Sequence, residues 1–480
     1  MLSLSNKNLD KIEAKSIKVP HYNRKDLKPS LVHIGLGAFH RAHYLSYIEK
    51  LMSDGVYTEG VYEIDIIPSK ESFVNSLEQQ DYLYTLLTKD PFGNEELEVR
   101  GGIANYANAS RDPKKVLDIL SSESTKLITL TVTEKGYTYD SENHKLDLNH
   151  PSIIKDLKPF KVPSSTIGAI SEALKQRFED SKAPLTIMSC DNVPENGNML
   201  KNCIHEFISI KYPEIKEWVS EYIIFPNTMV DRITPATTQE DIDSLEDKYG
   251  IRDICGVHSE DFSTWVIESV DVPEVQMFKK AGALVVDSVL PYELMKIRLL
   301  NGSHSALSYP SYLLGHRDVD DGINDPLIKD FIRNHYMEEI SKSLDSVDGV
   351  DIDEYKDQLI ERFSNKCIKD KLLRLASDGS KKISNAIVKP LLELKERDSL
   401  ILALALWADF LKGVDEKGES IVIEDPNAEV LQEKIKDDRE FMAFNGIDDE
   451  EVISTYSHFK SQIDREGVRA TLESYLKNNK

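Results

Sequence analysis

The feature that most constrains this chain is a change of sequence rhythm near residue 290 of its 480. Before that point, short apolar or β-branched runs alternate with polar stretches of helical period, which is typical of an α/β domain with a largely parallel sheet. The predicted strands span residues 31–34, 61–67, 126–133, 184–189 and 283–286. The predicted helices between them include residues 42–52, 166–178 and 197–210.

The remainder of the chain contains almost no strand-like runs. Amphipathic stretches of helical period take their place, at residues 327–341, 352–363, 368–376 and 398–411. A chain of 480 residues is long enough for two domains. We therefore expect an α/β domain over residues 1–287 and a mainly α-helical domain over residues 288–480.

The composition narrows the class of partner. The formal net charge is −24, with 83 acidic against 59 basic side chains, which argues against a nucleic acid or an anionic membrane. Four cysteines without paired spacing fit a reducing compartment better than a disulfide framework. No segment approaches the roughly 18 apolar residues of a membrane span, and none has the apolar core of a signal peptide. We expect a cytoplasmic protein with neither nucleic acid nor membrane as partner.

The first predicted strand, residues 31–34, runs directly into Gly35-Leu36-Gly37 and then into a helical pattern. Glycines at such a turn permit a tight bend and let the backbone approach the pyrophosphate of a dinucleotide. His40 stands where the third glycine of the G-x-G-x-x-G pattern would be, so the motif alone fits an ordinary strand–turn–helix equally well. Both a cofactor turn and a purely structural turn agree with these residues.

The end of the second strand is where a carboxylate ordinarily binds the ribose of NAD. We expect this strand to end at Ile67, which leaves Asp65 inside it and places the cation Lys70 just beyond. A lysine there favours the 2′-phosphate of NADP, whereas a solvated loop lysine explains the same residue without a ligand. The sequence thus predicts that the carboxylate that would bind the ribose is displaced or missing.

Three side chains that suit alcohol oxidation lie at relative positions 0, 5 and 8, namely Lys296, Asn301 and His304. On an α-helix of about 100° per residue they point near ~0°, ~140° and ~80°. The oxidation needs a base, and a lysine serves when burial or a nearby cation lowers its pKa from about 10.4 towards about 8. It also needs donors to the alkoxide, for which the neutral amides of Asn301 and Asn192 are candidates. A solvated lysine and a structural histidine are the ordinary alternatives.

Five stretches, in order along the chain, resemble one known family. They are GLGAFHRAH at residues 35–43, TVTEKGY at 131–137, SCDN at 189–192, FPNTMVDRITP at 225–235 and KIRLLNGSH at 296–304. The chain is similar, almost end to end, to the polyol-specific long-chain dehydrogenases, also called the mannitol dehydrogenase family, and most to its mannitol 2-dehydrogenase branch. The resemblance implies a Rossmann-type N-terminal domain, a mainly α-helical C-terminal domain and an active site between them.

By motif match, the resemblance implies Lys296 as general base, Asn192 and Asn301 as oxyanion donors and His304 as a residue that positions the substrate. It further implies substrate contacts from Asp231, Arg374 and Lys382, a proton relay through Glu134 and Glu293, and cofactor contacts from Gly35, Gly37, Ala38, Phe39, Arg41 and Lys70. An ion pair between Arg374 and Asp231 is the structural alternative for those two residues.

The resemblance implies an NAD(P)-dependent, zinc-independent oxidoreductase, active as a monomer, that interconverts a sugar alcohol and a ketose, D-mannitol and D-fructose. NAD is the expected cofactor, and Lys70 keeps NADP open. Cys255 and His258 are close but lack the further ligands of a zinc site, so no metal is expected. The alternatives are a fructuronate or tagaturonate reductase or a D-arabinitol dehydrogenase of the same family and, from another class, a non-catalytic nucleotide-binding sensor.

Overall fold

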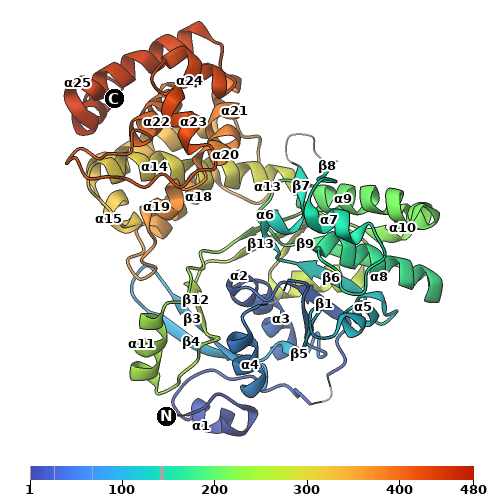
Figure 1. Ribbon diagram of the computed structural model, residues 1–480. Coiled ribbons are helices and arrows are strands. Elements are labelled where there is room, and N and C mark those ends of the chain that lie inside the picture. Colours follow the sequence, from blue (N-terminus) through green and yellow to red (C-terminus); the bar gives the residue numbers. More distant parts are fainter. Residues whose placement is uncertain (1, 26, 68, 141–144, 480) are drawn as a thin grey trace. The chain divides into compact units, whose positions relative to one another are not determined.

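The computed structural model describes residues 2–25, 27–67, 69–140 and 145–479 (Figure 1). The chain forms two compact units. The first comprises the residues up to Asp90 together with Asn94–Val289. The second comprises Pro91–Gly93 and the residues from Leu290 onwards.

The first unit is built on a six-stranded sheet in the order β10-β9-β6-β1-β2-β5, in which every neighbouring pair is parallel. Its strands are β1 (Leu31–Ile34), β2 (Val61–Asp65), β5 (Ile103–Asn108), β6 (Leu127–Leu130), β9 (Leu185–Ser189) and β10 (Ile223–Ile224). Counted along the chain and read from the β5 edge, the order is 3-2-1-4-5-6, which is that of the Rossmann fold. The expected Rossmann-type α/β domain is confirmed.

Two apolar cores flank this sheet. Val32 and Ile34 of β1 belong to the core that includes helices α5, α8 and α9, whereas Leu31 belongs to the core that includes α3 (Figure 1). Successive strand residues point to opposite faces, so one four-residue strand supports both cores.

The helices of this unit are α1 (Leu9–Glu13), α2 (Ala38–Ala42), α3 (Tyr44–Ser53), α4 (Glu71–Gln79), α5 (Pro113–Ser121), α6 (Thr133–Gly136), α7 (Pro151–Asp156), α8 (Thr166–Asp180), α9 (Asn196–Lys211), α10 (Lys216–Tyr222), α11 (Gln239–Tyr249) and α12 (Pro273–Gln276).

Smaller sheets accompany the main one. One has the order β12-β3-β4, one the order β11-β13-β14, and β7 pairs with β8. Their strands are β3 (Tyr84–Lys89), β4 (Glu95–Arg100), β7 (Tyr139–Asp140), β8 (Lys145–Leu146), β11 (Thr228–Asp231), β12 (Val257–Glu260), β13 (Thr264–Glu268) and β14 (Leu284–Val286). The strand predicted at residues 283–286 therefore exists, but it pairs with β13 and not within the large sheet.

Some predicted boundaries are wrong, each for a local reason. β2 ends at Asp65 and not at Ile67, which is 68% exposed and lies beyond the sheet in spite of its apolar side chain. β6 ends at Leu130, and Thr133, predicted as the strand's last residue, takes a left-handed φ of 63° and begins α6. The helix predicted from residue 368 begins at Leu372.

The second unit is helical throughout its described secondary structure, apart from two isolated β-bridges. Helix α22 (Asp398–Phe410) is buried over almost its whole length and packs against α14 (Gly302–Leu313) and α25 (Glu450–Asn478), which is broken at Gly467. The other α-helices are α13 (Leu290–Met295), α15 (Val319–Ile323), α16 (Pro326–Asp330), α17 (Met337–Ser341), α18 (Ile352–Phe363), α19 (Leu372–Ala376), α20 (Gly379–Ile383), α21 (Lys389–Glu393), α23 (Ala428–Lys434) and α24 (Asp438–Phe444). The expected mainly α-helical C-terminal domain is confirmed.

Three stretches of this unit are π-helical. They are η4 (Lys296–Asn301), η5 (Phe331–Tyr336) and η6 (Ser384–Val388), and η4 contacts η6. π-Helical turns are rare and occur frequently at functional sites. The first of them contains two of the three side chains that the sequence singles out for chemistry.

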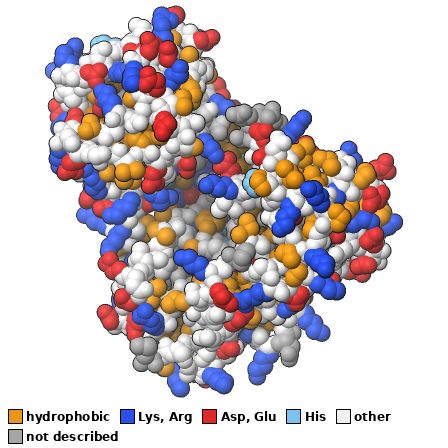
Figure 2. Space-filling model, viewed as in Figure 1, with side chains coloured by type: hydrophobic (Ala, Val, Ile, Leu, Met, Phe, Trp, Pro, Cys, Tyr) orange, Lys and Arg blue, Asp and Glu red, His pale blue; other side chains and the backbone are white. Residues whose placement is uncertain are grey.

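The surface is of mixed charge on the face drawn in Figure 2, where Lys and Arg side chains alternate with Asp and Glu. This mixture agrees with a chain that carries 59 basic side chains despite its net charge of −24. Among the residues described, no helix combines the length and apolar character needed to cross a membrane.

Candidate active site

The turn after β1 lies where the strand order of the large sheet reverses. β1 has β2 on one side and β6 on the other, and α/β proteins bind dinucleotides in the crevice at such a switch point. Gly35 has a φ of 108°, and a Cβ there would lie 2.2 Å from the carbonyl oxygen of Thr131, just after β6. Only glycine fits, because a side chain would both collide with backbone and strain the turn.

Gly37, at the start of α2, is exposed and differs from Gly35 in its surroundings. A Cβ added to Gly37 would meet no atom within 4 Å, so the backbone here borders open space. Close approach of a pyrophosphate requires such space, and the turn therefore fits a dinucleotide. Ala38 and Phe39 follow and are partly exposed, and the Phe39 ring stacks on His43 with 4.9 Å between centroids.

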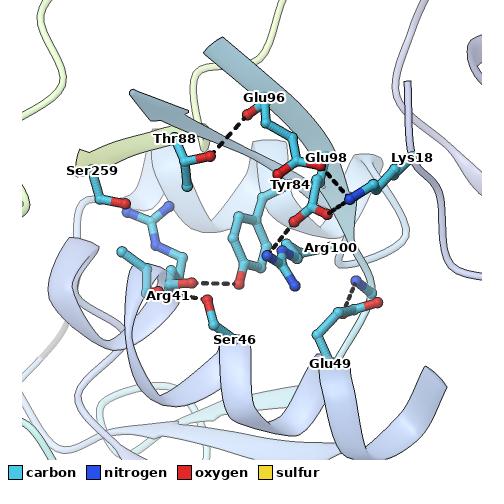
Figure 3. A network of polar contacts seen from close by, with 12 residues as sticks. Lys18, Arg41, Ser46, Glu49, Tyr84, Thr88, Glu96, Glu98, Arg100 and Ser259 are labelled. Carbon is cyan, nitrogen blue, oxygen red and sulfur yellow. Dashed lines mark hydrogen bonds and ion pairs between the residues drawn. The ribbon is translucent and has the colours of Figure 1, made fainter. Parts of the chain in front are cut away.

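Arg41 is buried and stabilises the glycine turn through hydrogen bonds to backbone carbonyl groups. Its guanidinium donates to the carbonyl oxygens of Cys255 and, at 3.2 Å from Nε, of Gly37. The same group lies 4.7 Å from the centre of the Phe73 ring. The Tyr84 hydroxyl donates to the Arg41 carbonyl oxygen at 2.7 Å (Figure 3). Arg41 thereby ties the turn to the residues around the β12-β3-β4 sheet.

A buried cluster of two histidines and a glutamate packs against the turn. The rings of His33 and His40 stack with centroids 3.4 Å apart, and His40 Nε2 lies 2.8 Å from Glu63 Oε1. His33 Nε2 lies 3.2 Å from the carbonyl oxygen of Gly35. Burial lowers the pKa of both histidines well below the usual value and raises the pKa of Glu63 to about 8. Near neutral pH the cluster is therefore mainly uncharged.

His33, His40 and Glu63 also form a group whose potential metal-binding atoms lie within 4.8 Å of one another. The two rings are only 12° from parallel. Because imidazole lone pairs lie in the ring plane, nearly parallel stacked rings direct them side by side and not towards one ion. This arrangement fits a hydrogen-bonded core.

Asp191, which follows β9, is a structural anchor that sequence reasoning passed over in favour of its neighbour Asn192. The Asp191 carboxylate accepts hydrogen bonds from the amides of Val132 and Thr133, both at 2.9 Å, and from the Tyr137 hydroxyl at 2.6 Å. It holds the backbone of Thr133 in its left-handed conformation, which is costly for a β-branched residue. The sequence signal that could have pointed to Asp191 was the family stretch at residues 189–192, which contains both Asp191 and Asn192.

The other predicted site residues of the first unit lie at strand ends or on the surface. Asn192 and Glu134 are exposed, the latter on α6, and Asp231 is the buried last residue of β11. The fully buried Asn196 donates to the carbonyl oxygens of Asp191 and Thr228, both at 3.0 Å. One amide thus fixes the end of β9 to the start of β11.

In the second unit, Lys296 and Asn301 are the first and last residues of the π-helical η4. Lys296 is 5% exposed, and Glu293, one turn before it, is 8% exposed. A π-turn closes from residue i to i+5, so the α-helical separation of about 140° expected for this pair is wrong. The distortion brings two residues five apart towards the same side of the helix. His304 lies on α14, with its ring centroid 4.8 Å from that of Phe363.

Two contacts hold the π-turn in place. Arg298, in its middle, binds both carboxylate oxygens of Glu393, at 2.7 and 2.9 Å, and the carbonyl oxygen of Ser343 at 2.6 Å. Gly302 follows the turn, and a Cβ there would lie 2.4 Å from the Tyr336 hydroxyl. Close packing against η5 therefore requires glycine at this position.

The remaining predicted substrate contacts lie on α19 and α20. Arg374 binds both carboxylate oxygens of Asp370, one turn earlier on the chain. Lys382 Nζ donates to the carbonyl oxygen of Leu375 at 3.0 Å, and burial lowers the pKa of its ammonium group. Both cations are thus oriented by partners within their own unit.

Both halves of the chain match models of known families. Residues 29–278 match the mannitol dehydrogenase Rossmann domain and residues 288–477 match the mannitol dehydrogenase C-terminal domain. The chain belongs to the mannitol dehydrogenase family. A mannitol 2-dehydrogenase of Aspergillus fumigatus is 36% identical over 499 residues, which cover 99% of this chain and 99% of that relative. The expected family is thereby confirmed.

Solved structures agree with this family over the whole chain. Pseudomonas fluorescens mannitol 2-dehydrogenase, in a ternary complex with NAD and D-mannitol, is 34% identical with a TM-score of 0.86, over 99% of this chain and 100% of that one. A D-sorbitol dehydrogenase in its substrate-free form is 29% identical with the same TM-score, over 96% of this chain and 99% of that one.

Proposed function

We propose that this member of the mannitol dehydrogenase family is an NAD-dependent, zinc-independent oxidoreductase that interconverts D-mannitol and D-fructose. The observation that carries the proposal is the likeness, over 99% of the chain, to an enzyme whose structure contains NAD and D-mannitol. The glycine turn at the switch point, with open space over Gly37, supports dinucleotide binding.

Lys296 is the proposed general base. The neutral amine takes the proton of the C2 hydroxyl as the C2 hydride departs, and the resulting ammonium passes its proton to solvent through Glu293 and Glu134. NAD, when bound, supplies the hydride acceptor. Burial of Lys296 keeps the amine away from bulk water.

Neutral and charged donors complete the proposed site. The amides of Asn192 and Asn301 donate to the developing alkoxide without adding a competing acid. His304 positions the substrate, and its other hydroxyls are bound by Asp231, Arg374 and Lys382. Around the cofactor, Gly35, Gly37, Ala38 and Phe39 form the contact surface that Arg41 supports.

Product analysis tests this proposal. Purified protein is given D-fructose and NADH in the presence of a chelator, and the reduced product is separated by chromatography. We expect D-mannitol and no loss of rate from the chelator. D-Fructuronate with NADH and D-arabinitol with NAD, tested in parallel, distinguish the uronate reductase and arabinitol dehydrogenase alternatives. Absence of turnover with every substrate would favour a nucleotide sensor.

D-Sorbitol oxidation is the second candidate, favoured by the likeness to D-sorbitol dehydrogenase. Mannitol and sorbitol differ only in configuration at C2, so both give D-fructose when that carbon is oxidised. The face from which hydride reaches the ketose decides between them. Sorbitol as the product of the same experiment would therefore replace the mannitol assignment and leave the base and donors unchanged.

A further inference from the structure

Asp191 connects two stretches of the first unit that carry proposed functional residues. Asn192, a proposed donor to the alkoxide, directly follows it, and Glu134, a proposed relay residue, directly follows Thr133. The Asp191 carboxylate accepts hydrogen bonds from the amides of Val132 and Thr133, both at 2.9 Å. One side chain therefore fixes the backbone next to both proposed functional residues.

A closed ring of hydrogen bonds fixes the Asp191 carboxylate relative to its own backbone. The Tyr137 hydroxyl donates to Asp191 Oδ2 at 2.6 Å, which uses its only hydrogen. Ser189 Oγ lies 2.6 Å from the same hydroxyl oxygen and is therefore the donor to Tyr137. Ser189 Oγ in turn accepts a hydrogen bond from the Asp191 amide at 3.2 Å. Ser189 and Tyr137 are fully buried, so bulk water does not compete for these bonds.

The remaining polar atom of Asp191, its carbonyl oxygen, is also bound. It accepts hydrogen bonds from the side-chain amide of Asn196 at 3.0 Å and from the backbone amide of Val193 at 2.9 Å. All four polar atoms of Asp191 thus have partners, whereas the side chain of the neighbouring Asn192 is exposed. Because the backbone that carries Asn192 is held by Asp191, the direction of the Asn192 amide depends on that carboxylate.

We propose that Asp191 is a positioning residue for the reaction, which acts by directing the amide of Asn192 at the developing alkoxide. This proposal rests on the dehydrogenase function proposed above. A donor to an oxyanion must be held in place, and a displacement of about 1 Å can lower the rate about 100-fold. A carboxylate with a structural role alone would stabilise the fold without changing the rate of the folded enzyme.

Asp156 provides a matched control in the same unit. Its fully buried carboxylate also accepts hydrogen bonds from two successive backbone amides, those of Ser164 at 2.9 Å and Ser165 at 2.8 Å, and from the Ser165 hydroxyl at 2.7 Å. Asp156→Asn and Asp191→Asn both replace an acceptor oxygen by an amide group that cannot accept, so both should lower the melting temperature. At saturating NADH and D-fructose, we expect kcat to fall about 10- to 100-fold in Asp191→Asn and to remain that of the wild type in Asp156→Asn.

A double-mutant cycle with Asn192→Ala tests whether Asp191 acts through its neighbour. Removal of one donor to an oxyanion typically lowers kcat by about 10²–10³-fold, and the direction of an amide that is already absent has no further effect. We therefore expect Asp191→Asn to lower kcat less than about threefold in the Asn192→Ala background. Equal factors in the two backgrounds would overturn the proposal.

Tyr137→Phe provides the same test if Asp191→Asn fails to fold. It opens the hydrogen-bonded ring but leaves the two backbone amides on the carboxylate. We expect kcat to fall by about 3- to 10-fold, and only while Asn192 is present. A loss of the same size in the Asn192→Ala background would again contradict a role through Asn192.

The outcomes separate this assignment from the proposed reaction. Unchanged kcat in Asp191→Asn, or an equal loss in Asp156→Asn, would overturn the role of Asp191 in an enzyme that still makes D-mannitol. If the wild-type protein turns over another substrate instead, the same cycle is measured with that substrate, and dependence on Asn192 would support Asp191 while the mannitol assignment fails. Absence of turnover with every substrate would overturn both.

Discussion

The turn at Gly35–Gly37 in the first unit and the π-turn η4 in the second, to which we assign the proposed cofactor and chemical sites, are built in opposite ways. The first depends on the absence of side chains, because the backbone at Gly35 lies against Thr131 and the backbone at Gly37 borders open space. The second works through side chains on a distorted backbone, since Lys296 and Asn301 mark the ends of a π-helical stretch. The comparison teaches that substitutions in the first region should alter folding or cofactor affinity, whereas those in the second should alter turnover.

The largest expected effect is that of Lys296→Ala. Loss of a positioned general base typically lowers kcat by about 10²–10⁴-fold. Because Lys296 belongs to the second unit, NADH affinity measured by fluorescence should remain that of the wild type. Unchanged turnover would remove Lys296 from the mechanism.

A matched control is available in the same unit. Lys356 is 2% exposed and paired with Glu338 at 3.1 Å and Asp353 at 3.0 Å. Lys356→Met also removes a buried ammonium group, so it should lower the melting temperature without lowering kcat. An equal loss of kcat in both variants would mean that burial of any lysine, and not its chemistry, explains the effect.

Alanine at the two glycines of the turn should have different consequences. Gly35→Ala forces a Cβ to 2.2 Å from a carbonyl oxygen at positive φ, and we expect the unfolding free energy to fall by about 3 kcal/mol or more. Gly37→Ala meets no atom within 4 Å, so the fold should persist while NADH affinity decreases. Thermal unfolding and fluorescence titration separate the two. Equal melting temperatures would contradict the predicted contrast.

The sequence predicts the regular parts of this fold well. Residues 31–34 and 352–363 match β1 and α18 at both ends. β1 is a short, continuously buried run, and in α18 the apolar periodicity coincides with burial. The β12-β3-β4 sheet was missed. The pairing of β12 with β3 joins Val257 to Leu86, far apart in the chain, so no local pattern reveals it. β3 and β4 form a local hairpin, with Lys89 opposite Glu95, that sequence reasoning overlooked. β2 was extended to Ile67 because an apolar run continues past the point where the pairing stops.

The sequence supplies candidate site residues but not their local geometry. The family stretches supply Lys296, Asn301 and Asn192, yet a π-turn has no period that a 3.6-residue pattern reveals. Asp191 was passed over because its importance comes from the backbone amides whose hydrogen bonds it accepts, both at 2.9 Å. Contacts of that kind depend on tertiary neighbours, which one sequence does not specify.

A smaller effect is expected at Gly302, which sharpens the account of the π-turn. Gly302→Ala places a Cβ 2.4 Å from the Tyr336 hydroxyl, and overpacking of this kind costs about 1–3 kcal/mol. The shifted turn should also lower kcat through Lys296. That hydroxyl is buried without a hydrogen-bond partner among the residues described, so Tyr336→Phe alone should be nearly neutral. The double variant should therefore recover much of the loss, and no recovery would contradict the packing argument.

The smallest expected effect is a change in pH dependence from Glu63→Gln, which tests whether the glycine turn is governed by geometry alone. The pKa of Glu63 is raised by burial to about 8, so the folded state holds this proton more tightly than the unfolded state. Its contribution to stability is fully present below the unfolded pKa and is lost as pH rises through about 8.

The lowered pKa values of His33 and His40 act in the opposite direction, since their contribution is present above the usual histidine pKa and lost as pH falls. Between pH 7 and 9 the glutamate therefore governs this cluster. We expect the melting temperature of the wild type to fall across that range more steeply than that of Glu63→Gln, with the exposed Glu71→Gln as control. Parallel curves for wild type and Glu63→Gln would show that the turn beside Gly35 does not sense this proton, and that its missing side chains alone define the site.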